Sequence, residues 1–179
     1  MEKVENPWSV PLSVEDIPET GLHIEIDAPE AARAGLIAVA GLRALPRLSA
    51  VFDLARRGAG VRVTGQVSAQ VGQTCIVTLE PLESDVEEPI DLVFAPSLPS
   101  GAAHGSAATT DQDADGEEPP EPLIGGQLDL GTIATEFLLL GIDPYPRKAG
   151  AEFMPPKADD TGGRPFAALE ALKKRLGGG

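Results

Sequence analysis

The longest regular pattern of hydrophobic and polar positions runs from Val61 to Val71. Apolar or small residues alternate there with Arg62, Thr64, Gln66, Ser68 and Gln70. Successive side chains of a strand point to opposite faces of a sheet, so a period of two predicts a half-buried strand. The polar residues would then form one face of a sheet and the apolar residues its core side.

The same period predicts further strands on both sides of this segment. They are an edge strand at Pro7–Val14, and strands at Leu22–Ile26, Ala44–Arg57, Cys75–Leu79 and Val86–Phe94. In the fourth of these, Cys75, Val77 and Leu79 would share one face. The connections after Val71 are short, and parallel strands need long crossovers, so we expect an antiparallel meander.

Three segments have helical features. They are Pro29–Gly41, Leu128–Ile142 and Phe166–Leu176. Proline suits a first helical turn and glycine a helix end, which fits the first and third segments. In the second, Asp129 is a suitable N-cap, and one face would carry Leu130, Ile133, Phe137 and Leu140. The third is amphipathic, and it could either fold back on the body or dock on a partner.

The predicted fold is α+β, with an antiparallel sheet of about five strands that could curve into a barrel-like form, and two or three helices. Residues 1–95 and 123–147 would form one domain. Residues 96–122 lack any aliphatic residue larger than Ala after Leu98, so nothing there offsets the ordering entropy, and we expect a disordered acidic insertion. Residues 148–179 would be a flexible tail carrying a short amphipathic helix at 165–176.

Composition narrows the class of protein. The chain has 179 residues, and aromatic residues make up only 4%, so the core must be aliphatic. Its one cysteine excludes an internal disulfide framework and a cysteine-rich zinc site, and fits a reducing compartment. No secretory signal is visible and no apolar run is long enough for a membrane span, so we expect a cytoplasmic protein.

The charge is unevenly distributed. The net charge is −14, and the stretch from Val63 to Pro146 has fifteen acids and no Lys or Arg. Wide contact with phosphates needs basic side chains, so this stretch argues against it. A small basic patch stays open, because five arginines lie close together in the sequence: Arg43, Arg47, Arg56, Arg57 and Arg62. Solvated faces are the alternative reading.

The residue types that carry chemistry are scarce. His23 should lie on a strand surface and His104 in the insertion. For Cys75 a buried inert thiol is favoured over a reactive one. No phosphate-binding loop or calcium loop fits the sequence. We therefore assign no catalytic, cofactor-binding or metal residues and expect a protein that is not an enzyme, although a hydrolase built on paired carboxylates stays a weaker alternative.

The segment Val63–Pro81 reads VTGQVSAQVGQTCIVTLEP. It resembles the core of the YceD-like family, the large ribosomal RNA subunit accumulation proteins, in the form seen in alphaproteobacteria. Ala44–Leu54, Asp129–Arg147 and Pro165–Lys173 resemble the family's preceding strand, its helix with a Pro-Tyr-Pro turn, and its tail. Many members have a second cysteine three positions after the first, and Thr78 stands there in this chain. A metal or dithiol role is thus lost here, or never belonged to the shared function.

The resemblance implies a non-enzymatic role in large-subunit ribosomal RNA synthesis, processing or accumulation, and so in ribosome biogenesis. The partner would be a large-subunit ribosomal RNA precursor or a ribosomal or processing protein, not DNA or a membrane. Candidate contacts are the five arginines, the polar residues Gln66, Gln70, Thr78 and Glu80, and Phe166, Leu169, Lys173 and Lys174 of the terminal helix. The alternative is an acidic adaptor or chaperone for a basic partner unrelated to ribosomes.

Overall fold

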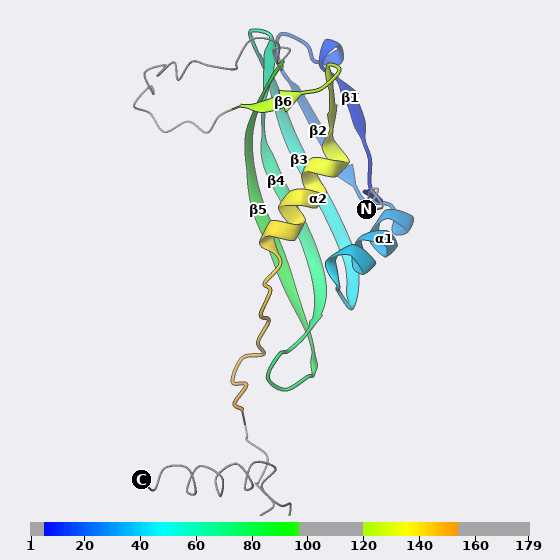
Figure 1. Ribbon diagram of the computed structural model, residues 1–179, viewed down its shortest axis with the longest axis vertical. Helices are drawn as coiled ribbons and strands as arrows, with labels where there is room; N and C mark the ends of the chain where they lie inside the picture. Colours follow the sequence, from blue (N-terminus) through cyan, green and yellow to red (C-terminus); the bar gives the residue numbers. More distant parts are fainter. Residues whose placement is uncertain (1–5, 97–119, 154–179) are drawn as a thin grey trace, which may run out of the picture.

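The computed structural model describes residues 6–96 and 120–153. Its main unit is a five-stranded sheet with the strand order β2-β3-β4-β5-β6 (Figure 1). The strands are β2 (Leu22–Asp27), β3 (Ala44–Arg57), β4 (Gly60–Thr74), β5 (Pro81–Pro96) and β6 (Glu121–Leu123). Neighbours pair antiparallel except β5 and β6, which pair parallel. The predicted α+β class and meander are confirmed, and the short strand β6 makes the sheet mixed.

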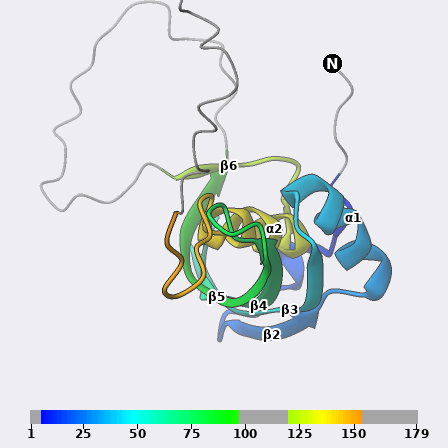
Figure 2. The ribbon, with the colours of Figure 1, turned by 90° about the horizontal axis from the view of Figure 1, so that it is seen from below.

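Glycines let strand β4 approach its neighbours closely. A Cβ on Gly65 would overlap the carbonyl oxygen of Val51 on β3, and one on Gly60 would overlap that of Phe94 on β5. Glycine inside a strand permits such contact and allows a sheet to bend. The sheet curves strongly around its concave side (Figure 2). It does not close into a barrel, since the described strand order ends at β2 and β6.

Helix α2 (Leu130–Gly141) lies in the hollow of the sheet (Figure 2). The carboxylate of Asp129 accepts a hydrogen bond from the backbone N–H of Thr132 at 3.0 Å, which confirms the predicted N-cap. Leu138 is buried against the strands, whereas Leu140 is 74% exposed. The prediction that Leu140 belongs to the buried face is therefore wrong, because the inward stripe continues from Leu130 in steps of four residues.

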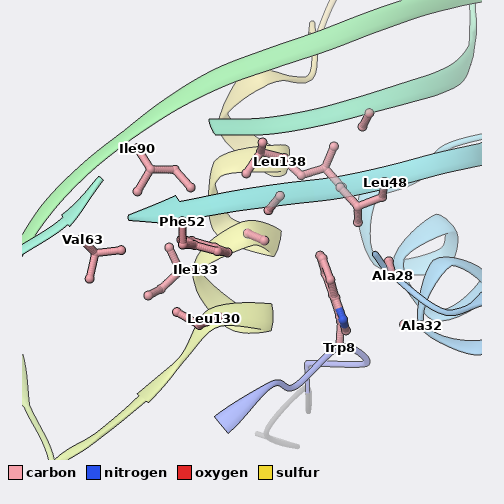
Figure 3. Close-up of a cluster of buried hydrophobic side chains, with 14 of the residues drawn as sticks. Trp8, Ala28, Ala32, Leu48, Phe52, Val63, Ile90, Leu130, Ile133 and Leu138 are labelled. Atoms are coloured by element: carbon pink, nitrogen blue, oxygen red, sulfur yellow. The ribbon is translucent and has the colours of Figure 1, made fainter. Parts of the chain in front are cut away.

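The core fills the space between α2 and the concave side of the sheet. Phe52 on β3 lies close to Leu130 and Ile133 of α2, with Trp8 beside them (Figure 3). Aliphatic side chains supply most of the other core residues, as the low aromatic content predicted. The fold thus buries one face of each long strand and leaves the other polar.

Two smaller elements flank the sheet. Helix α1 (Glu30–Ala40) packs against β3 and ends at Gly41, whose φ of 65° is left-handed, so the predicted helix is confirmed. A two-stranded sheet joins β1 (Pro11–Ser13) to β7 (Gln127–Asp129). A short 3-10 helix, Val14–Asp16, follows β1.

The predicted edge strand at Pro7–Val14 is mostly wrong. Only β1 is extended, and it pairs with β7 instead of the main sheet. Trp8 is only 3% exposed, and the backbone N–H of Val10 donates to the Asp129 carboxylate at 2.9 Å. The segment is therefore used to close the N-terminus of α2.

The predicted strand at Cys75–Leu79 is also wrong, because these residues form the turn between β4 and β5. Leu79 has a left-handed φ of 60° and is 76% exposed. Its N–H donates to the carbonyl of Cys75, and the N–H of Cys75 donates to that of Glu80, both at 2.9 Å. These bonds close the chain on itself, so Thr78 and Glu80 do not lie on the polar strand face.

The predicted insertion and terminal helix fall mainly on residues 97–119 and 154–179, which lie outside the described residues. At the borders of the insertion, Pro96 ends β5, and Glu121 and Pro122 belong to β6. These three border residues of the predicted insertion therefore lie in strands. Within the described ranges, no helix has the length and apolar character needed to cross a membrane.

Candidate functional site

The convex side of the sheet, here called the outer face, gathers part of the predicted docking surface. Arg47 pairs with Gln70, Val51 with Gln66, and Ala55 with Arg62 across β3 and β4. Paired residues of antiparallel strands share a face, so Arg47, Arg62, Gln66 and Gln70 all lie on the outer face. Gln70 and Arg62 are about 26 Å apart along the strand. The two arginines therefore lie near opposite ends of the face.

Strand β5 adds a line of carboxylates to the outer face. Glu83, Asp85 and Glu87 are exposed and alternate along the strand, and we call them the acidic row. Asp85 lies beside Gln70, and Glu87 beside Ser68. None of the three carboxylates forms an ion pair with another residue of the described ranges. The acidic row is a concentration of uncompensated negative charge.

Asp91 continues this line and has a cationic partner. Arg62 donates to its two carboxylate oxygens at 3.0 and 2.7 Å, and this hydrogen bonding lowers the pKa of the Asp91 carboxyl. The bidentate geometry fixes the guanidinium on β5. Arg62 is thus engaged on the outer face by a neighbouring strand.

The predicted arginines do not form one patch. Arg57 lies at the Arg62 end of the outer face, near enough to Asp91 for its charge to lower the pKa of that carboxyl, whereas Arg47 lies toward the other end. Arg56 has the inward position on β3, and it donates to the carbonyls of Ile17, Val14 and Glu15 at 2.6, 3.0 and 3.0 Å. Arg56 therefore holds the segment around the 3-10 helix in place. Arg43 precedes β3 and donates to the hydroxyl of Thr74 at 3.4 Å, whereas Arg57 ends β3 opposite Gly60. The arginine stretch is spread along the whole length of the sheet.

The turn from Cys75 to Glu80, here called the Cys75 turn, is organised around a sulfur atom. The Sγ of Cys75 accepts backbone N–H groups of Lys148 and Thr78, each at 3.4 Å. Hydrogen bonding lowers the pKa of the thiol from its ordinary 9.0 to about 6, first from the Lys148 N–H, then from the Thr78 side chain and then from the Thr78 N–H. Burial opposes the shift and is the smaller effect. The predicted burial of Cys75 is confirmed, but its environment is a turn with donors and not an apolar strand layer.

The loop after α2, residues 143–148, docks on the Cys75 turn. The N–H of Ile76 donates to the carbonyl of Pro146 at 3.0 Å, and the side chain of Gln73 donates to that of Asp143 at 2.8 Å. The Lys148 ammonium donates to the Glu80 carboxylate at 2.8 Å and lowers the pKa of that carboxyl. We call this assembly of turn and loop the clasp.

The sequence analysis did not predict that the Cys75 turn and the loop of residues 143–148 contact each other. Thr78 and Glu80 were expected on a strand face, and they instead lie beside Lys148 in the turn. Gln73, Pro146 and Lys148 were not candidates. The only signal was the separate resemblance of the Cys75 region and of Asp129–Arg147 to one family, which does not say that the two touch. Exposed apolar groups, Ile76 at 44% and Tyr145 at 69%, surround the clasp.

The remaining chemical groups are dispersed. His23 is exposed, as predicted, and its Nδ1 lies 2.7 Å from the Asp53 carboxylate, which raises the pKa of the imidazole. Within residues 6–96 and 120–153, no group of three or more His, Cys, Asp or Glu side chains could hold a metal ion.

Comparison with known proteins finds one family model that matches the chain. The family model described as large ribosomal RNA subunit accumulation protein YceD matches residues 63–173, a range that contains most of β4, all of β5 and α2, and both halves of the clasp. No curated protein and no solved structure matches the chain. The family's description names the accumulation of a ribosomal RNA, which is a role in ribosome biogenesis, and no reaction. The chain therefore belongs to the YceD family of large ribosomal RNA subunit accumulation proteins.

Proposed function

We propose that this protein supports the accumulation of large-subunit ribosomal RNA as a non-enzymatic factor that acts by binding. We further propose that its direct partner is a basic ribosomal or processing protein, contacted in the cytoplasm, and not naked ribosomal RNA. The observation that carries the choice of partner is the acidic row of Glu83, Asp85 and Glu87.

The electrostatics of the outer face favour a cationic partner. Alternate residues of a strand are about 6.6 Å apart, so the acidic row repeats a negative charge at a spacing that Lys and Arg side chains can follow. Phosphates would meet these carboxylates with like charge. Tight binding of a nucleic-acid backbone also depends on basic side chains that displace counterions, and none lies between Val63 and Pro146.

The geometry of the arginines supports the same choice. Arg62 is bound to Asp91, and Arg56 to three carbonyl groups. Arg47 lies about 33 Å along β3 from Arg57. A continuous basic track for RNA would need all of these side chains side by side, whereas only Arg57 and Arg62 lie near each other. Family membership meanwhile supports a ribosomal partner over the alternative of an adaptor unrelated to ribosomes.

The test offers the purified full chain two ligands at physiological salt. One is protein-free large-subunit ribosomal RNA, and the other is the mixture of proteins extracted from large-subunit precursors. We expect the chain to retain proteins and not the RNA, with retention falling as salt rises. The variant Glu83→Gln/Asp85→Asn/Glu87→Gln should lower retention by about tenfold.

A matched control removes the same charge elsewhere. Glu15, Asp16 and Glu30 are exposed residues outside the main sheet, so Glu15→Gln/Asp16→Asn/Glu30→Gln should keep the retention of the original chain. Equal loss of protein retention in both variants would mean that net charge causes the effect, and it would contradict a specific role of the acidic row. Binding of the protein-free RNA that strengthens when the acidic row is neutralised would contradict the proposed partner.

A further inference from the structure

A groove of about 820 Å³ lies beside α2, outside the acidic row and the clasp. One wall is the α2 face that carries Thr132, Glu136 and Leu140. The others are the last part of β5 and the segment from β6 to β7. The groove thus follows α2 for about 12 Å.

The groove has an apolar lining that is open to solvent. Leu92, Phe94 and Phe137 are half-buried in it. Leu140 is 74% exposed and Ile124 is 77% exposed. Several large apolar side chains open to solvent along one groove are typical of a docking surface. A segment with its own apolar stripe would bury both surfaces.

The rim of the groove is acidic. Glu121 and Glu136 line it, together with Asp91, whose charge is paired with Arg62, and none of the described residues that line it is basic. Burial, followed by the charge of Glu121, raises the pKa of the Glu136 carboxyl. Two carboxylates that repel each other beside an apolar surface favour an occupant that brings positive charge.

We propose that the groove is the docking site of this chain's own C-terminal segment, residues 165–176. Its pattern predicts an amphipathic helix with the apolar stripe Phe166, Leu169, Leu172 and Leu176. Lys173, Lys174 and Arg175 follow at its end and match the acidic rim in charge. A helix of this length measures about 18 Å, so it can cover the whole length of the groove along α2.

The intervening chain is long enough for this docking. The described part ends at Phe153, so residues 154–164 link it to the segment and reach about 36 Å when extended. The path from Leu140 to Phe153 is shortened by two tight turns. In the first, the N–H of Tyr145 bonds the side chain of Asp143, and in the second the N–H of Ala151 bonds the carbonyl of Lys148. The linker can therefore return the segment to the groove of the same molecule.

Hydroxyl-radical footprinting of the full chain tests the proposal with an internal reference. Leu140 is 74% exposed in the described structure and Leu79 is 76% exposed, so without a cover the two leucines should react alike. We expect Leu140 to react about tenfold more slowly than Leu79 in the original chain. In Leu169→Asp/Leu172→Asp, which breaks the apolar stripe, Leu140 should reach the rate of Leu79.

The matched control is Ala167→Asp/Ala171→Asp, which adds the same charge on the opposite side of the predicted helix and should leave Leu140 protected. The proposal is overturned if Leu140 reacts like Leu79 in the original chain, or if its protection survives Leu169→Asp/Leu172→Asp. Protection that appears only as the protein concentration rises, together with dimers in sedimentation, would assign the groove to a second copy and also overturn it. The acidic row takes no part in this test, so its outcome is independent of the partner proposed above.

Discussion

The backbone N–H of Lys148 donates a hydrogen bond to the Sγ of Cys75 over 3.4 Å, although 73 residues separate the two in the chain. The bond joins the tip of the β4–β5 hairpin to the loop that leaves α2. With the bonds from Ile76 to Pro146 and from Gln73 to Asp143, it fixes where the chain departs from the sheet. The clasp is thus a structural junction that a single sulfur atom helps to hold.

Replacing Cys75 should show how much the sulfur contributes. Cys75→Ala removes the acceptor of two part-buried N–H groups, so its melting temperature should fall by a few degrees. Cys75→Ser keeps an acceptor and should lose less. Retention of the basic partner by the acidic row should survive in both variants. If Cys75→Ala melted like the original chain, the N–H bonds to sulfur would have no role in stability.

The stability of the protein should depend on pH through the same thiol. Its pKa is about 6 in the folded chain and 9.0 ordinarily, so the folded state releases the proton first. The thiol's contribution to the free energy of unfolding therefore grows from pH 6 to pH 9 and is complete above pH 9. It is lost as the pH falls through the folded pKa of about 6. Urea midpoints from pH 5.5 to 9 would measure it.

His23 changes stability with pH in the opposite sense, because the pKa of its imidazole is raised when folded. The difference between the original chain and Cys75→Ala isolates the thiol, since both contain His23. That difference should widen from pH 6 to pH 9. A constant difference across this range would contradict the lowered pKa of Cys75.

Arg56 should stabilise the fold, whereas Arg47 should not. Arg56→Met removes a guanidinium that donates to three carbonyl groups, and we expect a loss of about 2 kcal/mol in the free energy of unfolding. Arg47 is exposed on the outer face, and Arg47→Met should change stability by less than about 0.5 kcal/mol. Denaturant titration of the two variants compares them directly. Similar losses of stability in both variants would contradict a stabilising role that is specific to Arg56.

Gly65 should resist substitution by even the smallest side chain. A Cβ there would meet the carbonyl oxygen of Val51 on β3, so Gly65→Ala must push two central strands apart. We expect destabilisation by more than about 2 kcal/mol, or failure to fold. Ser68→Ala, on the outer side of the same strand, should be nearly neutral. Calorimetry of both variants makes the comparison, and a neutral Gly65→Ala would mean that the sheet can relax its curvature.

Local patterns predicted the long elements well. The alternation around Val63 placed β4, and Pro29 and Gly41 bracketed α1 at the observed residues. Asp129 was expected as the N-cap of α2 and is one. Period-two patterning and helix caps depend on residues near in sequence, which is why reading along the chain finds them.

The errors arose where distant residues decide the local structure. Cys75, Val77 and Leu79 keep a strand pattern, but the N–H of Cys75 donates to the carbonyl of Glu80 and the N–H of Lys148 donates to the Cys75 sulfur, and the segment forms a turn. Leu140 was expected to face the core, although the direction of α2 is set by its packing in the curved sheet. The clasp shares this origin, because its two halves are far apart in the sequence and are brought together by the tertiary structure.

The acidic row also bears on how molecules of this protein treat one another. From Pro81 to Val93, the edge of β5 that faces away from β4 has no hydrogen-bonded strand among the described residues. A strand of another molecule can pair with such an edge. Two copies meeting there would bring their carboxylates together, and Pro89 offers no N–H to continue a ladder. The like charges and the missing N–H of Pro89 therefore disfavour self-association and aggregation at this edge in a crowded cell. A strand or loop that carries positive charge can still bind there.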